Sequence, residues 1–298
     1  MKETMVLIRR VTVVFVVALA WGGAALAQTA GAMPPAPPLS ILVGDDDGIE
    51  SEGIIALAGE LAQLGDLTVV APLTNHSGAG HAVTTEGPIK VKPIKRDGKP
   101  FGYGVTGTPV TAIMLGLDAI MQRPPDVVVS GVNEGHNMGQ VIYTSGTFGV
   151  AREAVIRGIP GIAVSLERGK DNDFGLAAKF TKSLVQHFQR YGFPRGVVVN
   201  VNVPACKEAD LKGVMLTKLS DWRWHNMWYQ RADPFGNQYY WNRIRKPLVA
   251  PAPGSDAWAV ANKMISVSLV PLEAPSAVVP VKREFDGFSF LGKALVRP

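Results

Sequence analysis

The sequence is short of cysteine and of charge. It has one cysteine, Cys206, among 298 residues, and acidic and basic residues together make up only 18%. A single cysteine excludes a disulfide-stapled scaffold, and Cys206 is expected to be a small buried apolar residue rather than a nucleophile. The chain also lacks a Gly-X-Y period and any visible repeat of roughly 20 to 50 residues, which excludes collagen and argues against a solenoid. Its 47% hydrophobic content excludes intrinsic disorder.

Apolar residues are concentrated at the N-terminus. Lys2, Arg9 and Arg10 precede an uncharged apolar run at 11–20, and the small-x-small triplet 25–27 follows. This pattern predicts a signal peptide over residues 1–27, with cleavage before residue 28 and export to the periplasm or the medium. Two alternatives stay open: the run at 11–27 serves as a membrane anchor, or the arginine pair begins a twin-arginine signal.

The segment after the signal is rich in proline. Residues 28–38 hold Pro34, Pro35, Pro37 and Pro38 and are expected to form an extended linker. Three basic residues and one acidic residue lie in residues 1–27, so cleavage lowers the formal net charge from +5 to +3. We therefore expect no stable nucleic-acid partner, and no membrane span once the signal is removed.

The rest of the chain alternates apolar strands with helices. Strands are expected at 41–43, 68–71, 127–129, 162–164 and 197–203, and helices at 53–64, 108–121, 147–157 and 176–191. Such strands, apolar without polar alternation, indicate an α/β fold: a doubly wound, mostly parallel, Rossmann-like sheet over residues 39–204. Residues 205–298 are expected to form a β-rich extension or oligomerisation arm of the same domain, with a hairpin near 233–241. Ligands of such sheets bind beyond the carboxyl ends of the strands.

Three adjacent carboxylates follow the first expected strand. Asp45, Asp46 and Asp47 repel one another unless a cation compensates, which predicts a hard divalent metal bound by oxygen atoms. The spacing does not fit an EF-hand, because positions 1 and 12 of such a loop would be Val43 and Ile54. The alternative is a solvated acidic turn that caps the next helix.

Polar loops follow the second and third strands. Residues 72–81 include Asn75, Ser77 and His81, and residues 130–139 include Asn133 and His136. Neighbouring parallel strands deliver such loops to one edge of the sheet, so these groups are expected to converge. Either histidine is a candidate leaving-group acid, with an ordinary hydrogen-bonded loop histidine as the alternative.

A hydroxyl-rich segment opens the helix expected at 147–157. Ser145, Gly146 and Thr147 put free backbone N–H groups, two hydroxyls and a residue without a side chain at a helix start, which is typical of an anion site. The segment is not a Walker A loop, since no Gly-Lys-Ser/Thr is present. A plain Ser/Thr cap is the alternative. An acidic metal cluster facing an anion site suggests metal-assisted phosphate chemistry.

The C-terminal part carries an aromatic block. It consists of Trp222, Trp224, Trp228, Tyr229, Tyr239, Tyr240 and Trp241, interleaved with arginines. Packing within a hairpin or at an oligomer interface is the favoured interpretation. A surface for stacking single-stranded nucleic acid or the substrate's base is the alternative.

The ordered motifs resemble the survival protein SurE family of metal-dependent nucleotidases. They are Asp46-Asp47-Gly48, Val69-Val70-Ala71-Pro72 with Asn75 and Ser77-Gly78, Gly107-Thr108-Pro109, Ser130-Gly131-Val132-Asn133, Ser145-Gly146-Thr147, Asn200-Val201-Asn202-Val203-Pro204 and Asp233-Pro234. The resemblance covers most of residues 40–272. It departs from the usual pattern at Asp45, where the family usually has Asn, and at Thr111, where it often has Asp. An exported member is also unusual.

The resemblance implies a site and an activity. It implies one divalent cation per subunit, Mg²⁺ or Mn²⁺ (with Ca²⁺ a candidate in crystals), held by Asp46, Asp47, Ser77 and Asn133. It implies phosphate contacts from Asn133, Ser145, Gly146 and Thr147, and homodimers or homotetramers. The expected reaction is hydrolysis of nucleoside monophosphates, as a 5′- or 3′-nucleotidase with broad acid phosphatase activity. Asp46 or Asp47 is expected to act as the base or nucleophile, and Asp45, Asn75, His81 and His136 are further candidates.

Two functions from different classes compete. The first is the exported phosphomonoester hydrolase. The second is a catalytically silent metal- and phosphate-binding protein of the cell envelope, built from the same loops. A different hydrolase on this fold lacks support, because no Gly-x-Ser-x-Gly elbow is present.

Overall fold

The computed structural model describes residues 37–170, 172–245, 250–272, 287 and 289–296. The expected signal peptide, 1–27, and most of the expected linker, 28–36, lie outside the described residues. All elements described below belong to one compact unit that begins at Ala36. None of the helices in the described ranges is long and apolar enough to cross a bilayer.

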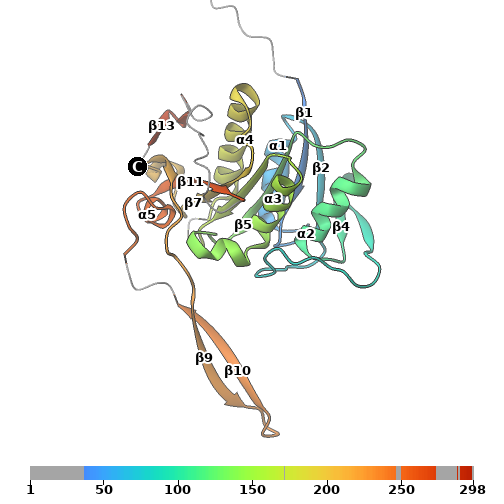
Figure 1. Ribbon diagram of the computed structural model, residues 1–298, viewed down its shortest axis with the longest axis vertical. Helices are drawn as coiled ribbons and strands as arrows, with labels where there is room; N and C mark the ends of the chain where they lie inside the picture. Colours follow the sequence, from blue (N-terminus) through green and yellow to red (C-terminus); the bar gives the residue numbers. More distant parts are fainter. Residues whose placement is uncertain (1–36, 171, 246–249, 273–286, 288, 297–298) are drawn as a thin grey trace, which may run out of the picture. The chain divides into compact units, whose positions relative to one another are not determined.

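A sheet of eleven strands forms the centre of the fold, in the order β12-β13-β8-β11-β7-β6-β5-β1-β2-β4-β3 (Figure 1). Its parallel middle consists of β1 (Leu39–Gly44), β2 (Gly65–Pro72), β4 (Lys99–Val105), β5 (Val127–Glu134), β6 (Gly161–Leu166) and β7 (Val197–Val203). The remaining members are β3 (Val91–Arg96), β8 (Gly213–Thr217), β11 (Met264–Pro271), β12 (Ser289–Phe290) and β13 (Lys293–Val296). The predicted α/β fold with a mostly parallel sheet is confirmed.

Helices cover the two faces of this sheet (Figure 1). Alternate residues of one strand enter different cores: Ile41 and Val43 pack with α1 (Glu52–Leu61) and α4 (Phe174–Tyr191). Leu42, between them, packs with α2 (Pro109–Leu115) and α3 (Gly146–Ile156). Successive side chains of a strand point to opposite faces, so a strand that is apolar throughout needs helices on both sides.

Hydroxyl side chains cap three of these helices. Ser51, Thr108 and Ser145 each accept a hydrogen bond from a backbone N–H in the first turn of α1, α2 and α3. Pro109 occupies the first turn of α2, as predicted. The α-helix there ends at Leu115 and continues as a π-helical turn, Gly116–Ile120, so the predicted span 108–121 contains two kinds of helix. Three further short elements are 3₁₀ turns Gly139–Thr144 and Glu208–Asp210, and helix α5 (Asp256–Ala261).

The hairpin predicted near 233–241 is present, formed by β9 (His225–Ala232) and β10 (Gln238–Arg245). Its turn is held by the Asp233 side chain, which accepts hydrogen bonds from the backbone N–H groups of Phe235 and Asn237. The strands β3 and β4 were not expected from the sequence. Their segment is rich in proline, glycine and lysine, which are depleted in strands, and pairing at the sheet edge overrides that preference.

The order of the strands creates a crevice. From β1 the chain moves to β2 on one side, and later returns to β5 on the other side of β1. The loops that follow β1 and β5 therefore lead away in opposite directions, which leaves room for a ligand beyond the strand ends.

Candidate active site

Asp46 lies at the centre of the site, at the end of β1. Its carboxylate is 3% exposed and accepts two hydrogen bonds from the first turn of α3. Thr147 Oγ1 donates to Oδ1 at 2.5 Å, and the Gly146 N–H donates to Oδ2 at 3.2 Å. Burial raises the pKa of the Asp46 carboxyl, and the Thr147 hydrogen bond opposes this rise. The predicted anion-binding helix start thus contacts a predicted metal ligand directly.

Asp47 joins the loops that follow β2 and β5. Its Oδ1 accepts hydrogen bonds from the side chains of Asn75, at 2.9 Å, and Ser77, at 3.3 Å. Its Oδ2 accepts the backbone N–H of Glu134 at 2.7 Å. Asn75 also accepts the Ser77 N–H at 2.7 Å, which shapes the loop that presents the Ser77 hydroxyl. These contacts bring together the loops after three strands, a convergence that the sequence predicted, although Glu134 was not among the predicted site residues.

Asp45 has different partners from its two neighbours. Its side chain is fully buried, accepts the Asp46 N–H at 2.8 Å and accepts the Ser51 hydroxyl at 3.4 Å, beside the start of α1. Burial, followed by the charges of Asp46 and Asp47, raises the pKa of the Asp45 carboxyl well above its ordinary value. Asp45 therefore stabilises the turn that presents the other two carboxylates.

A bulge in β5 presents Asn133. The register with β6 shifts between Ser130 and Asn133, and Gly131 has φ +129°. A Cβ at Gly131 would lie 2.3 Å from the Val164 carbonyl oxygen, so a larger residue does not fit. The Asn133 amide nitrogen donates to the Gly135 carbonyl at 2.5 Å. Its amide oxygen is consequently the atom left to act as a ligand.

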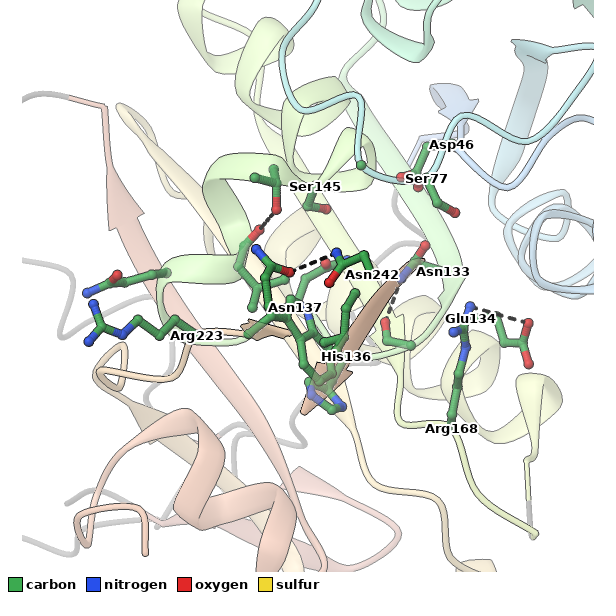
Figure 2. Close-up of a pocket in the computed structure, with 18 residues that line it drawn as sticks. Asp46, Ser77, Asn133, Glu134, His136, Asn137, Ser145, Arg168, Arg223 and Asn242 are labelled. Atoms are coloured by element: carbon green, nitrogen blue, oxygen red, sulfur yellow. Dashed lines mark hydrogen bonds and ion pairs between the residues drawn. The ribbon is translucent and has the colours of Figure 1, made fainter. Parts of the chain in front are cut away.

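These residues border one cavity of about 750 Å³. Asp46, Ser77, Asn133 and Ser145 all line it, and Figure 2 shows Asp46, Ser77 and Ser145 in its upper part with Asn133 below them. The lining also includes residues that were not singled out from the sequence, among them Glu134, Gln140, Arg168, Asn226 and Asn242. Arg168 follows β6 and pairs with Glu134 at 3.8 Å. Arg168 could have been predicted as a site residue, because it lies just after a strand that the sequence predicted.

The two candidate histidines have different surroundings. His81 Nδ1 accepts from Arg152 Nε at 3.0 Å, and Nε2 lies 3.1 Å from Glu153 Oε2. Burial, then the Arg152 charge, lowers the pKa of His81, which favours the neutral ring with its proton on Nε2. His81 is not part of the cavity lining, whereas His136 is buried and lines it. The structure thus brings His136, and not His81, to the cavity.

A buried amide network supports the loop that carries His136. The Asn137 N–H donates to Asn202 Oδ1 at 2.7 Å, and the Asn137 carbonyl accepts from the side chains of Asn200, at 2.9 Å, and Asn202, at 3.1 Å. The Asn137 side chain donates to Ser165 Oγ at 2.9 Å. All four residues are buried on or above β6 and β7. They fix the cavity floor to the centre of the sheet.

The donor atoms suit a hard divalent cation. Within the described residues, no group of three His, Cys, Asp or Glu side chains is arranged to hold a metal. The predicted ligand set instead combines two carboxylates with the Ser77 hydroxyl and the Asn133 amide oxygen. Oxygen-only sets of this kind, including neutral oxygens, match Mg²⁺ or Mn²⁺ better than Zn²⁺. Burial also raises the pKa of the Asp46 carboxyl, because it disfavours the charged form. A bound cation would stabilise that charged form.

Known proteins share this arrangement of sequence and fold. A sequence model of the family described as Survival protein SurE matches residues 41–226. The "5'-nucleotidase SurE" of Chlorobium luteolum is 40% identical over 228 residues, which cover 76% of this chain and 88% of that protein. The "5'-nucleotidase SurE" of Syntrophobacter fumaroxidans is 39% identical over 230 residues, covering 77% and 92%.

A solved structure agrees with the fold. The crystal structure of the SurE protein from Aquifex aeolicus superposes with a TM-score of 0.69 at 35% sequence identity. The match covers 79% of this chain and 94% of the Aquifex chain. The match therefore extends over nearly the whole of that protein.

Proposed function

The chain belongs to the survival protein SurE family, and on that premise we propose that it is a divalent-metal-dependent phosphomonoester hydrolase acting on nucleoside monophosphates. The observation that carries the proposal is the contact between the buried Asp46 carboxylate and the first turn of α3, beside Asp47, Ser77 and Asn133. The nucleotidase names of its relatives support catalysis over the alternative of a silent binding protein.

The proposed mechanism assigns each residue a task. Asp46, Asp47, Ser77 and Asn133 would hold the cation, which supplies Lewis-acid polarisation of a phosphoryl oxygen when bound. The Ser145 hydroxyl, which lines the cavity, and the N–H groups at the start of α3 are the donors for the phosphate oxygens as negative charge develops there, while the Thr147 hydroxyl holds the Asp46 carboxylate. Ser145 caps α3 by accepting the Phe148 N–H at 3.0 Å, which fixes the direction of those donors.

Asp46 and Asp47 supply either the base that takes a proton from the attacking water or the nucleophile itself. The stereochemical course at phosphorus separates these two routes. Direct attack by water inverts the configuration, whereas two successive displacements through an aspartyl phosphate retain it. A chiral thiophosphate ester, hydrolysed in isotopically labelled water, reports which course this enzyme follows.

The test of the activity uses the purified protein without residues 1–27. We expect Mg²⁺- or Mn²⁺-dependent release of phosphate from adenosine 5′-monophosphate and p-nitrophenyl phosphate, loss of activity with EDTA, and recovery on adding the cation back. Asp46→Asn should abolish turnover, while Asp66→Asn, on an exposed residue of β2, should not. Retained cation binding without any turnover would favour the silent binding protein instead.

Location and assembly extend this proposal. The basic residues and apolar run within 1–27 support export to the periplasm or the medium, where the enzyme would act on extracytoplasmic nucleotides. Fractionation of cells that express the full chain, with mass analysis of the mature N-terminus, tests export. Light scattering of the purified protein tests the proposed homodimer or homotetramer.

A further inference from the structure

The cavity continues beyond the residues that the proposed mechanism uses. Asp46, Ser77, Asn133 and Ser145 account for the part that would hold the cation and the phosphate. Most of the rest of the lining comes from the segment after β5 and from the hairpin with its preceding segment, and includes His136, Arg223, Trp224, Asn226, Asn242 and Ile244. This second group has the composition of a site for a planar, partly polar molecule.

Trp224 is fixed in place by two other rings. It stacks on His136 with a centroid distance of 5.3 Å and an interplanar angle of 30°. His136 meets the edge of Trp222 at 5.1 Å and 80°, and Trp222 meets Trp224 at 5.9 Å and 75°. The three rings therefore contact one another in pairs. Such packing fixes the orientation of the Trp224 ring before any ligand binds, which lowers the entropy cost of stacking.

Two amides lie beside this ring system in the same cavity. Asn242 Nδ2 donates to Asn226 Oδ1 at 2.9 Å across the hairpin, and this bond is drawn at the Asn242 label in Figure 2. That bond orients both amides and leaves hydrogen-bonding capacity on each, as donor at Asn226 and as acceptor at Asn242. A neighbouring donor and acceptor match the edge of a nucleobase, which presents both kinds of group.

We infer that this end of the cavity is the nucleobase subsite, in which the base stacks on Trp224 and its edge is read by Asn226 and Asn242. The inference rests on the proposed function, because it takes the ester held at Asp46 to be a nucleotide. The cavity volume of about 750 Å³ lies in the range that accommodates small-molecule ligands. The enzyme would then favour nucleoside monophosphates over phosphate esters that lack a base.

The test compares two substrates that differ only in the base. The quantity measured is the ratio of kcat/KM for adenosine 5′-monophosphate to that for ribose 5-phosphate. Trp224→Leu, which keeps apolar volume, should lower this ratio about tenfold, as the loss of one stacking contact implies. Trp224→Phe, which keeps an aromatic ring, should retain most of the wild-type ratio. Trp228→Leu is the matched control, since Trp228 is a nearby tryptophan on β9 that is 63% exposed and outside the cavity lining.

A binding measurement separates this inference from the proposed function. Adenosine has no phosphate, so its binding, followed by calorimetry without added metal, does not depend on catalysis. We expect the wild type to bind adenosine more tightly than ribose, and Trp224→Leu to lose that difference. If adenosine binds but no phosphate ester is hydrolysed, the proposed function is wrong and the subsite stands. An unchanged substrate ratio and unchanged adenosine binding in Trp224→Leu would overturn the subsite.

Discussion

Thr147 donates a hydrogen bond to the carboxylate of Asp46 across 2.5 Å, although 101 positions separate the two residues in the chain. The contact joins the end of β1 to the start of α3, and both side chains are buried. The contact therefore places a charged carboxylate, just after a strand, against hydrogen-bond donors in the first turn of a helix. Catalysis should depend on the chemistry of this contact and not only on the shape of the two side chains.

Replacing Thr147 by Val tests that dependence. Valine has nearly the same shape but removes the hydroxyl, so the Asp46 carboxylate loses its Thr147 donor. We expect kcat/KM to fall by about 10- to 100-fold, as for the loss of a hydrogen-bond partner that orients a metal ligand. Thr147→Ser keeps the hydroxyl and should retain activity within about tenfold. Equal activities of the two variants, with equal thermal unfolding, would contradict a role for the hydroxyl.

Gly146 leaves no room for a side chain. A Cβ there would lie 2.6 Å from the Asp46 Cβ and 2.9 Å from its Oδ2. Gly146→Ala should displace the carboxylate and weaken Mn²⁺ binding, measured by calorimetry, by about tenfold or more. Gly59→Ala is the control, because nothing lies within 4 Å of that position in α1. It should leave Mn²⁺ binding unchanged and raise stability by up to about 1 kcal/mol.

Asp45 should tolerate the loss of its charge. Asp45→Asn keeps an oxygen to accept the Asp46 N–H, and its amide can donate to the Ser51 hydroxyl. It also removes one of three neighbouring acidic groups. We expect activity to be retained and the free energy of unfolding to change by no more than about 1 kcal/mol. Asp45→Ala, which leaves the buried N–H without its acceptor, should cost about 1–3 kcal/mol. A loss of activity in Asp45→Asn would show that the charge itself is needed.

His81 should make stability depend on pH. Burial lowers its pKa in the folded state below the ordinary value of 6.5, so the unfolded chain binds the proton first as the pH falls. Stability should therefore fall below about pH 6.5 until the folded His81 also becomes protonated. His81→Gln should lose less stability than the wild type between pH 7.5 and pH 5 in urea unfolding. His225→Gln, on the exposed start of β9, should behave as the wild type; identical losses in all three proteins would refute the assignment.

The sequence predicted most of the strand ends that carry the site. The runs ending at Val43 and Val129 are apolar without alternation, which identified buried parallel strands, and the loops after parallel strands meet at one edge. That rule alone placed Asp47, Ser77 and Asn133 together. The cap by Ser145 was also predictable, because a hydroxyl before a helix has a known local partner.

Other features depend on contacts that no local pattern encodes. Asn137, Asn200 and Asn202 form one network across 65 positions, and the sequence showed the two strand asparagines as part of a motif without indicating their partner. The resemblance set Asp45 apart from Asp46 and Asp47 but gave it no role, because its role depends on the direction in which one turn places its side chain. Arg168 and Asn242 lie just after or beside elements that were predicted, but whether their side chains reach the cavity depends on tertiary packing.

The residues that line the cavity lie on or beside two sheets: the eleven-stranded central sheet and the two-stranded hairpin. The β9–β10 hairpin forms its own two-stranded sheet and, in the described part of the chain, shares no ladder with the eleven-stranded sheet. Residues of the hairpin can therefore change without shifting a strand that carries Asp46 or Asn133. With the proposed base subsite partly on the hairpin, substrate range and reaction chemistry would depend on different stretches of sequence. Exchange of residues 222–244 between family members offers a way to move selectivity from one enzyme to another.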